Sequence, residues 1–166
     1  MASGQTHDLL NLITLPVFLY GVPHEYFPYF GSAYVLSTIL MSPDIDLPHS
    51  KPSKRWKILK VFWGPYRKIF KHRGASHLPI VGTLTRLLYV FFVVMFLYFV
   101  LIGIMSFAHY SDYFIKSSDT FLNNIKSTFT QEDVFWFLMG AILSDIVHIF
   151  WDTVLSFLKK LKRFIR

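Results

Sequence analysis

Apolar residues gather into long runs along this chain, and the lengths of the runs predict helices. Residues 87–108 carry no charge over 22 positions, and about 20 apolar residues suffice for a helix to cross a bilayer. Residues 134–158 form a second long run, which only three ionisable side chains interrupt. Each of these two runs therefore predicts a transmembrane helix.

The N-terminal apolar stretch is broken rather than continuous. Residues 9–43 contain a single charge, Glu25, and prolines and glycines recur through the middle of the stretch. Because proline and glycine interrupt helices, the pattern predicts a helical hairpin over 8–43, with helices near 8–22 and 29–42. The hairpin either crosses the bilayer and returns or dips into it, and in both versions its two ends lie on the same side.

The composition places this helical pattern in a membrane. Of the 166 residues, 53% are hydrophobic and 19% aromatic, while only 16% are charged, which is too apolar for a soluble domain of this length. We therefore expect one all-α domain over 1–166, a small helical membrane bundle made of the N-terminal hairpin and two long transmembrane helices. The chain has no cysteine, so a metal site would use histidine nitrogen and carboxylate oxygen.

The distribution of charge predicts the orientation in the membrane. Nine Lys or Arg residues and no acidic residue occur in 51–73, and five more basic residues occur in the tail 159–166. The segment 109–133 holds two lysines against four acidic residues. Since positively charged segments remain in the cytoplasm, we expect the loop 44–86 and both termini to be cytoplasmic and the loop 109–133 to be external.

The basic stretch is interleaved with aromatic residues, among them Trp56, Trp63 and Tyr66. This pattern is typical of a surface that meets anionic lipid headgroups, so membrane lipids are the expected partners. A basic patch can also bind nucleic acid. The orientation rule already accounts for the charge, however, and we disfavour nucleic acid as a partner.

The last apolar run carries three ionisable residues that lipid would not tolerate. A charge near the bilayer centre costs about 2.5–3.5 kcal/mol. At about 100° per residue, Asp145, His148 and Asp152 fall within about 60° of one another on a helix, so this stripe should face protein, water or metal. Asp145 is the deepest of the three, and it is either a ligand in a wet cavity or a carboxylate that orients His148.

Polar groups at the ends of the other predicted helices complete a candidate metal site. His7 opens the hairpin, Asp44 and Asp46 close it, and a loop with His72 and His77 precedes the third helix. The predicted topology puts all of these at the cytoplasmic face, where imidazole and carboxylate ligands suit one or two divalent ions of zinc, manganese or magnesium. The predicted metal ligands are His7, Asp44, His72, His77, Asp145, His148 and Asp152.

Several of these stretches carry a family resemblance. They are SGQTHD at 3–8, SPDID at 42–46, RW at 55–56, WGPYR at 63–67, HRGASH at 72–77 and GTLTRLLY at 82–89, with His148 and Asp152. In them the chain resembles a family of bacterial membrane proteins known as uncharacterised metal-binding proteins. That family is related to inner-membrane proteins under LexA control that are described as metal-dependent hydrolases. The resemblance implies metal binding, a bacterial inner-membrane location and hydrolase activity, while the cytoplasmic side of the site follows from the charge distribution.

Three functions remain open at this point. The first is a metal-dependent hydrolase at the membrane surface, where a divalent ion activates water against a phosphoester or a lipid-linked substrate. In that case Asp46 is the candidate base or a second metal ligand, and Arg73 holds an anionic group. The second is a non-enzymatic membrane protein with a structural metal, and the third is metal transport or sensing. The sequence contains no serine-hydrolase or nucleotide-binding motif.

Overall fold

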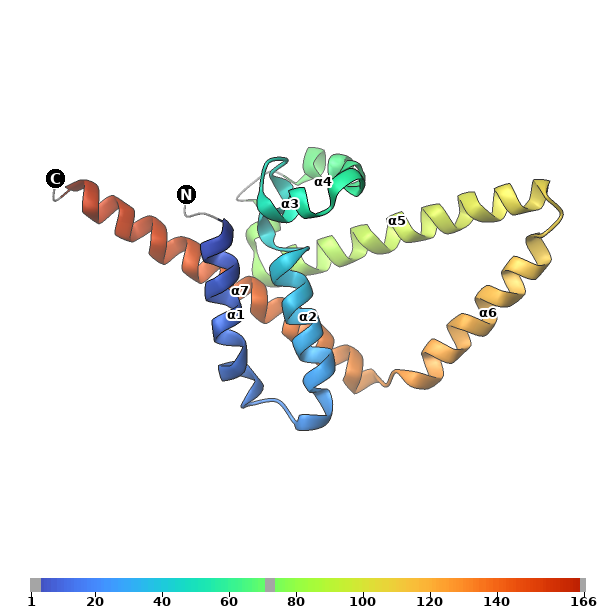
Figure 1. Cartoon of the computed structure of the whole chain (residues 1–166), viewed down its shortest axis with the longest axis horizontal. Coiled ribbons are helices and arrows are strands. Elements are labelled where there is room, and N and C mark those ends of the chain that lie inside the picture. The colour runs from blue at the N-terminus through green and yellow to red at the C-terminus, as the bar shows by residue number, and fades with distance from the viewer. Residues whose placement is uncertain (1–3, 71–73, 165–166) are drawn as a thin grey trace.

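The computed structural model describes residues 4–70 and 74–164, and every element that these residues form is helical (Figure 1). The all-α prediction is confirmed for this part of the chain. The α-helices are α1 (Gly4–Leu19), α2 (Phe27–Ile39), α3 (Lys51–Arg55), α4 (Trp63–Ile69), α5 (Pro79–Phe107), α6 (Ser111–Thr128) and α7 (Gln131–Phe164). Short 3-10 turns lie between them: η1 (His24–Tyr26), η2 (Pro43–Asp46), η3 (Lys57–Phe62) and η4 (Ala75–His77).

The N-terminal hairpin forms from α1 and α2, as the broken apolar stretch predicts. Pro23 has an extended backbone and leads from α1 into the turn η1. The hydroxyl of Tyr34, in α2, donates a hydrogen bond to the Asn11 carbonyl at 3.1 Å and lies 2.9 Å from the Thr14 hydroxyl, both in α1. These bonds fasten the two helices side by side, so the start of α1 and the end of α2 lie at the same end of the hairpin (Figure 1).

The most extensive helix packing in the fold is between α2 and α7. Gly140 permits the close approach, because a Cβ at this position would lie 2.3 Å from the backbone oxygen of Phe30. One turn further along α7, the Ser144 hydroxyl lies 2.9 Å from the Thr38 hydroxyl, and the Ser144 carbonyl accepts a hydrogen bond of 3.1 Å from Asn11. Small residues of this kind let helix backbones approach closely, and here they bring α1, α2 and α7 together.

Two helices, α5 and α7, are long and apolar enough by length and composition to cross a membrane. The helix α7 extends beyond the predicted run 134–158 at both ends, whereas α5 begins eight residues before the predicted run 87–108 and ends at Phe107. At the start of α7, the Asp133 carboxylate accepts a hydrogen bond from the Thr130 amide at 2.7 Å, and the Thr130 hydroxyl accepts one from the Asp133 amide at 3.2 Å. This reciprocal cap fixes the first turn.

The segment 109–133, expected as an external loop, consists mostly of the 18-residue helix α6. The connection is therefore helical where a loop was expected, and the physical reason is a helical period in its apolar residues, while its external placement stays a prediction. The segment 44–86 is likewise folded into short helical elements. In the cap that η2, α3, η3 and α4 form, Ile45, Trp63 and Tyr66 are buried together, and the Arg67 guanidinium donates to the Ile45 carbonyl at 3.0 Å.

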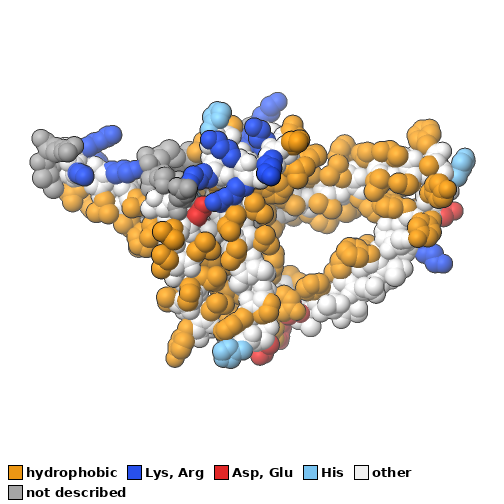
Figure 2. Space-filling view, in the orientation of Figure 1, with side chains coloured by type: hydrophobic (Ala, Val, Ile, Leu, Met, Phe, Trp, Pro, Cys, Tyr) orange, Lys and Arg blue, Asp and Glu red, His pale blue; other side chains and the backbone are white. Residues whose placement is uncertain are grey.

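The folded chain keeps the asymmetry of charge seen in the sequence. Lys and Arg side chains gather over the cap and along the C-terminal end of α7, while the length of α5 is apolar (Figure 2). The acidic start of α7, with Glu132 and Asp133, and the corner between α5 and α6 lie away from the cap (Figure 1). The basic residues thus mark one end of the molecule.

Candidate metal centre

Two histidines from opposite ends of the chain meet where α1 crosses α7. His7, in the first turns of α1, and His148, in α7, are both buried, and their ring centroids lie 5.0 Å apart. The Nε2 of His7 also lies 3.8 Å from Oδ1 of Asp152, one turn beyond His148. Two imidazoles that share one tetrahedral ion have ring centroids about 5 Å apart, so this spacing suits a common ligand.

The two turns η2 and η4 bring a carboxylate and a third imidazole to the same place. Oδ2 of Asp44 lies 3.7 Å from Nε2 of His148, and Oδ1 of Asp44 lies 3.8 Å from Nε2 of His77. Asp44 therefore stands between the two imidazoles. A continuous series of contacts runs through the cluster of His77, Asp44, His148, His7 and Asp152, which we call the His–Asp cluster.

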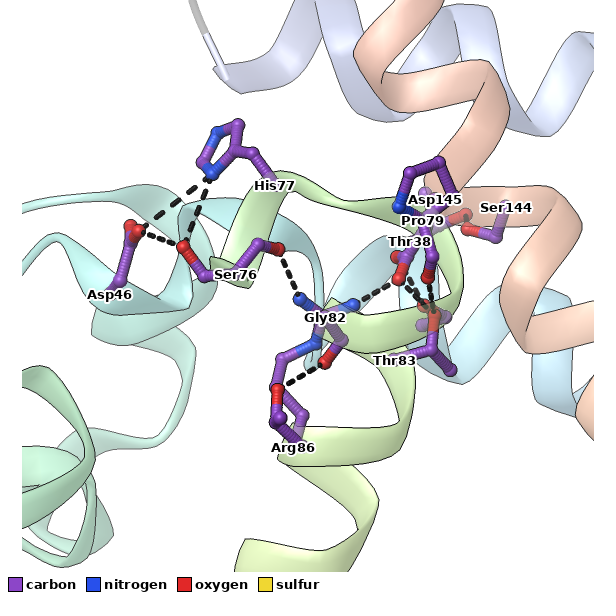
Figure 3. A network of polar contacts seen from close by, with 12 residues as sticks. Thr38, Asp46, Ser76, His77, Pro79, Gly82, Thr83, Arg86, Ser144 and Asp145 are labelled. Atoms are coloured by element: carbon purple, nitrogen blue, oxygen red, sulfur yellow. Dashed lines mark hydrogen bonds and ion pairs between the residues drawn. The ribbon is translucent and has the colours of Figure 1, made fainter. Parts of the chain in front are cut away.

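Asp46 lies behind this cluster and not in it. Its buried carboxylate accepts a hydrogen bond of 2.8 Å from the Ser76 hydroxyl, and it lies 3.8 Å from Nδ1 of His77 (Figure 3). Nδ1 of His77 thus faces Asp46, while Nε2 of the same ring faces Asp44. A carboxylate on the far nitrogen is the arrangement that orients histidines at metal sites.

Asp145 has different partners from the other two residues of its stripe. Its carboxylate accepts a hydrogen bond of 3.0 Å from the Ser37 hydroxyl, and it also contacts the Thr83 hydroxyl and the guanidinium of Arg86. Arg86 donates in addition to the Ser76 carbonyl at 3.1 Å (Figure 3). Since Asp145 and Arg86 are both 1% exposed, they form a buried ion pair that ties α5 to α7 and to the turn η4.

The structure bears unevenly on the residues predicted from the sequence. The polar stripe of α7 does face the other helices, and His7, Asp44, His77, His148 and Asp152 come together. Asp145 pairs with Arg86 and stands apart from the cluster. Of the two roles considered for it, that of a metal ligand is therefore disfavoured. His72 and Arg73 lie outside the described residues, and their assignments stay predictions.

Sequence reasoning missed Arg86 as a partner of Asp145. The predicted apolar run begins at residue 87, directly after Arg86, whereas Arg86 lies inside α5 and is buried. Two signals pointed to it: Asp145 is an acid in an apolar helix and needs a cation, and Thr83, one turn before Arg86, gives that face of α5 a second polar group.

The donor chemistry of the His–Asp cluster fits a divalent ion. Imidazole and carboxylate are ligands of zinc and related metals. Nδ1 of His7 and the hydroxyl of Ser42, which precedes the turn that carries Asp44, are both buried and have no hydrogen-bond partner in the part of the chain that the structure describes. Buried polar atoms of this kind usually bind water or an ion. A ligand at the cluster could therefore satisfy these two atoms.

The side chains are not drawn tightly around a single point, however. Within residues 4–70 and 74–164, no three His, Asp or Glu side chains converge closely enough to hold an ion as they stand. Two ligands of a tetrahedral ion at about 2.1 Å lie about 3.4 Å apart, and the pairs measured here are 3.7–3.8 Å apart. A contraction of a few tenths of an ångström would bring each of these three pairs to the separation that a shared ion requires.

Electrostatics keep Asp44 in the form that a metal requires. Burial by itself raises the pKa of the Asp44 carboxyl, but the adjacent imidazoles of His148 and His77 lower it by more, and the net pKa lies well below the ordinary value. Asp44 is therefore a carboxylate anion at neutral pH, with both oxygens directed at imidazole nitrogens.

Two comparisons with known proteins find similarity over most of this chain, and one of them, with a protein family, names metal binding. An uncharacterized protein of Aquifex aeolicus (strain VF5) is 42% identical over 139 residues, which cover 84% of this chain and 98% of that protein. No solved structure matches. Residues 2–162 match the family described as uncharacterized metal-binding protein (DUF2227), and because this match spans nearly the whole sequence, the chain belongs to that family.

Proposed function

We propose that this protein is embedded in a bacterial inner membrane and binds a divalent metal at its basic, cytoplasmic face, where it hydrolyses a phosphoester or another lipid-linked substrate. The observation that carries the proposal is the His–Asp cluster. Its five side chains come from α1, η2, η4 and α7. Contacts of 3.7–3.8 Å join them in two groups, and the rings of His7 and His148, with centroids 5.0 Å apart, bring the two groups together. Polar residues that only terminated their helices would not be expected to converge in this way.

The surface of α5 supports a membrane location. None of the residues in its most apolar 18-residue window is buried, and phenylalanines along it are widely exposed, with Phe92 at 65% and Phe96 at 67%. Soluble proteins rarely expose an apolar patch of that extent. A bilayer would cover this surface, and the positive-inside rule would then place the basic cap and the cluster beside it in the cytoplasm.

The accessibility of the cluster favours hydrolysis over a purely structural metal. Structural metal sites are closed, whereas catalytic sites keep one position open for water. The imidazoles of His7 and His148 are buried, but the Asp44 and Asp152 side chains are 19% and 26% exposed, so the cluster is open on its carboxylate side.

The residues have separate tasks in this proposal. Once bound, a divalent ion would lower the pKa of water and polarise a phosphoryl oxygen. His7, Asp44, His77, His148 and Asp152 would hold the ion, with Asp46 orienting His77. Asp46 is therefore a positioning residue and not the base. Lysines of the neighbouring cap, such as Lys57 and Lys60, are suited to an anionic headgroup.

Metal content and hydrolysis measured on the same purified protein test the proposal. We expect wild-type protein in detergent to contain about one divalent ion per chain and to release product from phospholipids or lipid-linked phosphates. Asp44→Asn should lose both properties, and His49→Ala, an exposed histidine a few residues away, should keep both. A folded, metal-loaded protein that cleaves no substrate would favour the structural-metal alternative, and a metal-free wild type would refute the proposal.

The orientation has its own test. Reporter domains fused after Lys57, after Asp119 and at the C-terminus should report cytoplasm, exterior and cytoplasm. A cytoplasmic signal at Asp119 would overturn the topology. The connection between α5 and α7 would then lie on the same side as the cap, and α5 could not cross the membrane.

A further inference from the structure

The helix α6 has one apolar face and no core to bury it in. None of its residues is buried. At about 100° per residue, its Phe, Ile and Leu side chains fall in one arc of about 120° and its charged side chains in an adjoining arc of about 80°, while Tyr113 falls outside both. The apolar arc consists of Phe114, Ile115, Phe121, Leu122 and Ile125, and the charged arc of Asp112, Lys116, Asp119 and Lys126.

The apolar arc is turned toward α5 but is covered by it only at the start. The ring of Phe114 lies 5.7 Å from the ring of Tyr98, in α5. Two turns later the contact has ended, since Phe121 is 65% and Leu122 49% exposed. Figure 2 shows hydrophobic side chains along the edge of α6 that faces α5, and uncharged polar ones along the opposite edge.

The position of α6 in the fold is equally specific. It joins the end of α5 to the start of α7 and so closes a triangle at the part of the molecule away from the basic cap (Figure 1). The 29 residues of α5 span about 43 Å at 1.5 Å per residue, more than the hydrocarbon thickness of about 30 Å. If α5 and α7 cross the bilayer, α6 is tethered by both ends to the far leaflet.

We infer that α6 is an interfacial helix that binds the lipid surface on the side opposite the metal centre, with Phe121, Leu122 and Ile125 among the acyl chains. This inference rests on the membrane location in the proposed function, and not on the metal or the hydrolysis. Amphipathic helices of low overall hydrophobicity lie in the plane of the interface in this manner.

Lipid is the occupant that the surroundings favour over a second copy of the chain. The apolar arc of α6 continues directly into the exposed apolar surface of α5, which a bilayer would cover in the same layer. The two acidic and two basic residues of α6 cancel, so the helix has no charge that selects a protein partner or an anionic headgroup. Its attachment to the surface would be apolar.

The absence of cysteine in the sequence allows a direct test, because single cysteines can be introduced without background labelling. Phe121→Cys and Ile125→Cys place a nitroxide spin label on the apolar arc, and Asn123→Cys and Ser127→Cys place it on the polar face of the same turns. All four positions are exposed, so the substitutions leave the packing of the fold intact. The labelled proteins are reconstituted into vesicles of phosphatidylethanolamine and phosphatidylglycerol.

We expect the ratio of collisions with oxygen to collisions with a water-soluble nickel chelate to be several-fold higher at 121 and 125 than at 123 and 127. Low collision with both reagents at 121 and 125 would mean that protein covers the arc, and high nickel collision there would mean that water does. Either result overturns the inference. Labels at Phe92→Cys and Phe96→Cys, on α5, separate the two proposals: if they are lipid-exposed while 121 is not, only the role of α6 fails, and if they are not, the membrane location fails too.

Discussion

Nε2 of His148, in the last helix, lies 3.7 Å from Oδ2 of Asp44, in the turn that follows the N-terminal hairpin. This contact joins two parts of the His–Asp cluster that the packing of α2 on α7 brings together. The second oxygen of Asp44 reaches His77. Among the residues that the structure describes, Asp44 is consequently the carboxylate that lies within 4 Å of imidazoles from two different elements, which makes it the most informative residue to change.

Replacement of Asp44 by Asn should abolish metal binding with little change in the fold. The amide has nearly the shape of the carboxylate but no negative charge, so the ion loses an anionic ligand where the environment is partly desolvated. We expect the metal content of Asp44→Asn, measured by elemental analysis, to fall at least about tenfold. His49→Ala should retain the wild-type content, and retention of metal by Asp44→Asn would remove Asp44 from the site.

Removal of the metal should destabilise the wild type and spare the Asp44→Asn variant. An ion that binds only the folded state stabilises it by mass action, by about 2.7 kcal/mol at a free concentration of 100 times Kd. We expect a chelator to lower the thermal unfolding temperature of wild-type protein in detergent and to leave that of Asp44→Asn unchanged. Equal shifts in both proteins would show that the chelator acts elsewhere.

Gly140→Ala should weaken the contact between α2 and α7. The added Cβ would meet the Phe30 carbonyl oxygen at 2.3 Å, so the two backbones must separate, and overpacking of this kind costs about 1–3 kcal/mol. Gly31→Ala is the matched control, because a Cβ there meets nothing within 4 Å and alanine is the better helix former. Thermal unfolding should show a loss for the first variant and none for the second.

The helix α6 shows how far the sequence could go and where it stopped. Long apolar runs identified α5 and α7 because a run of more than 20 apolar residues has few other interpretations. The segment 109–133 is polar on average, and the average concealed a helical period in Phe114, Phe121 and Ile125. In the structure these residues and the charged residues point in different directions around the axis of α6. A count of charges along the segment cannot show this difference in direction.

The sequence predicted which residues belong to the candidate site better than it predicted which of them contact one another. An acid or histidine in an apolar helix stands out, so His148 and Asp152 could be found from the sequence alone. The sequence alone could not show which cationic side chain pairs with Asp145, because that depends on how α5 packs on α7. That packing places Arg86 beside Asp145 and leaves His148 for Asp44.

Substitutions of the two carboxylates of the α7 stripe should therefore have different effects. Asp152 lies 3.8 Å from His7, at the open side of the His–Asp cluster, whereas Asp145 neutralises Arg86 in the interior. Asp152→Asn should lose metal and keep its unfolding temperature in the presence of a chelator. Asp145→Asn leaves a buried guanidinium without its counter-charge, which costs about 3–5 kcal/mol, so it should unfold at a much lower temperature.

A double variant distinguishes loss of the ion pair from loss of a metal ligand. Arg86→Met with Asp145→Asn removes both charges, and replacement of a buried ion pair by uncharged groups is often tolerated where removal of one partner is not. We expect the double variant to recover much of the stability lost in Asp145→Asn and to bind metal as the wild type does. If it is stable but metal-free, the buried pair supports the metal centre after all, either through Asp145 itself or through the hydrogen bond from Arg86 to the Ser76 carbonyl beside His77.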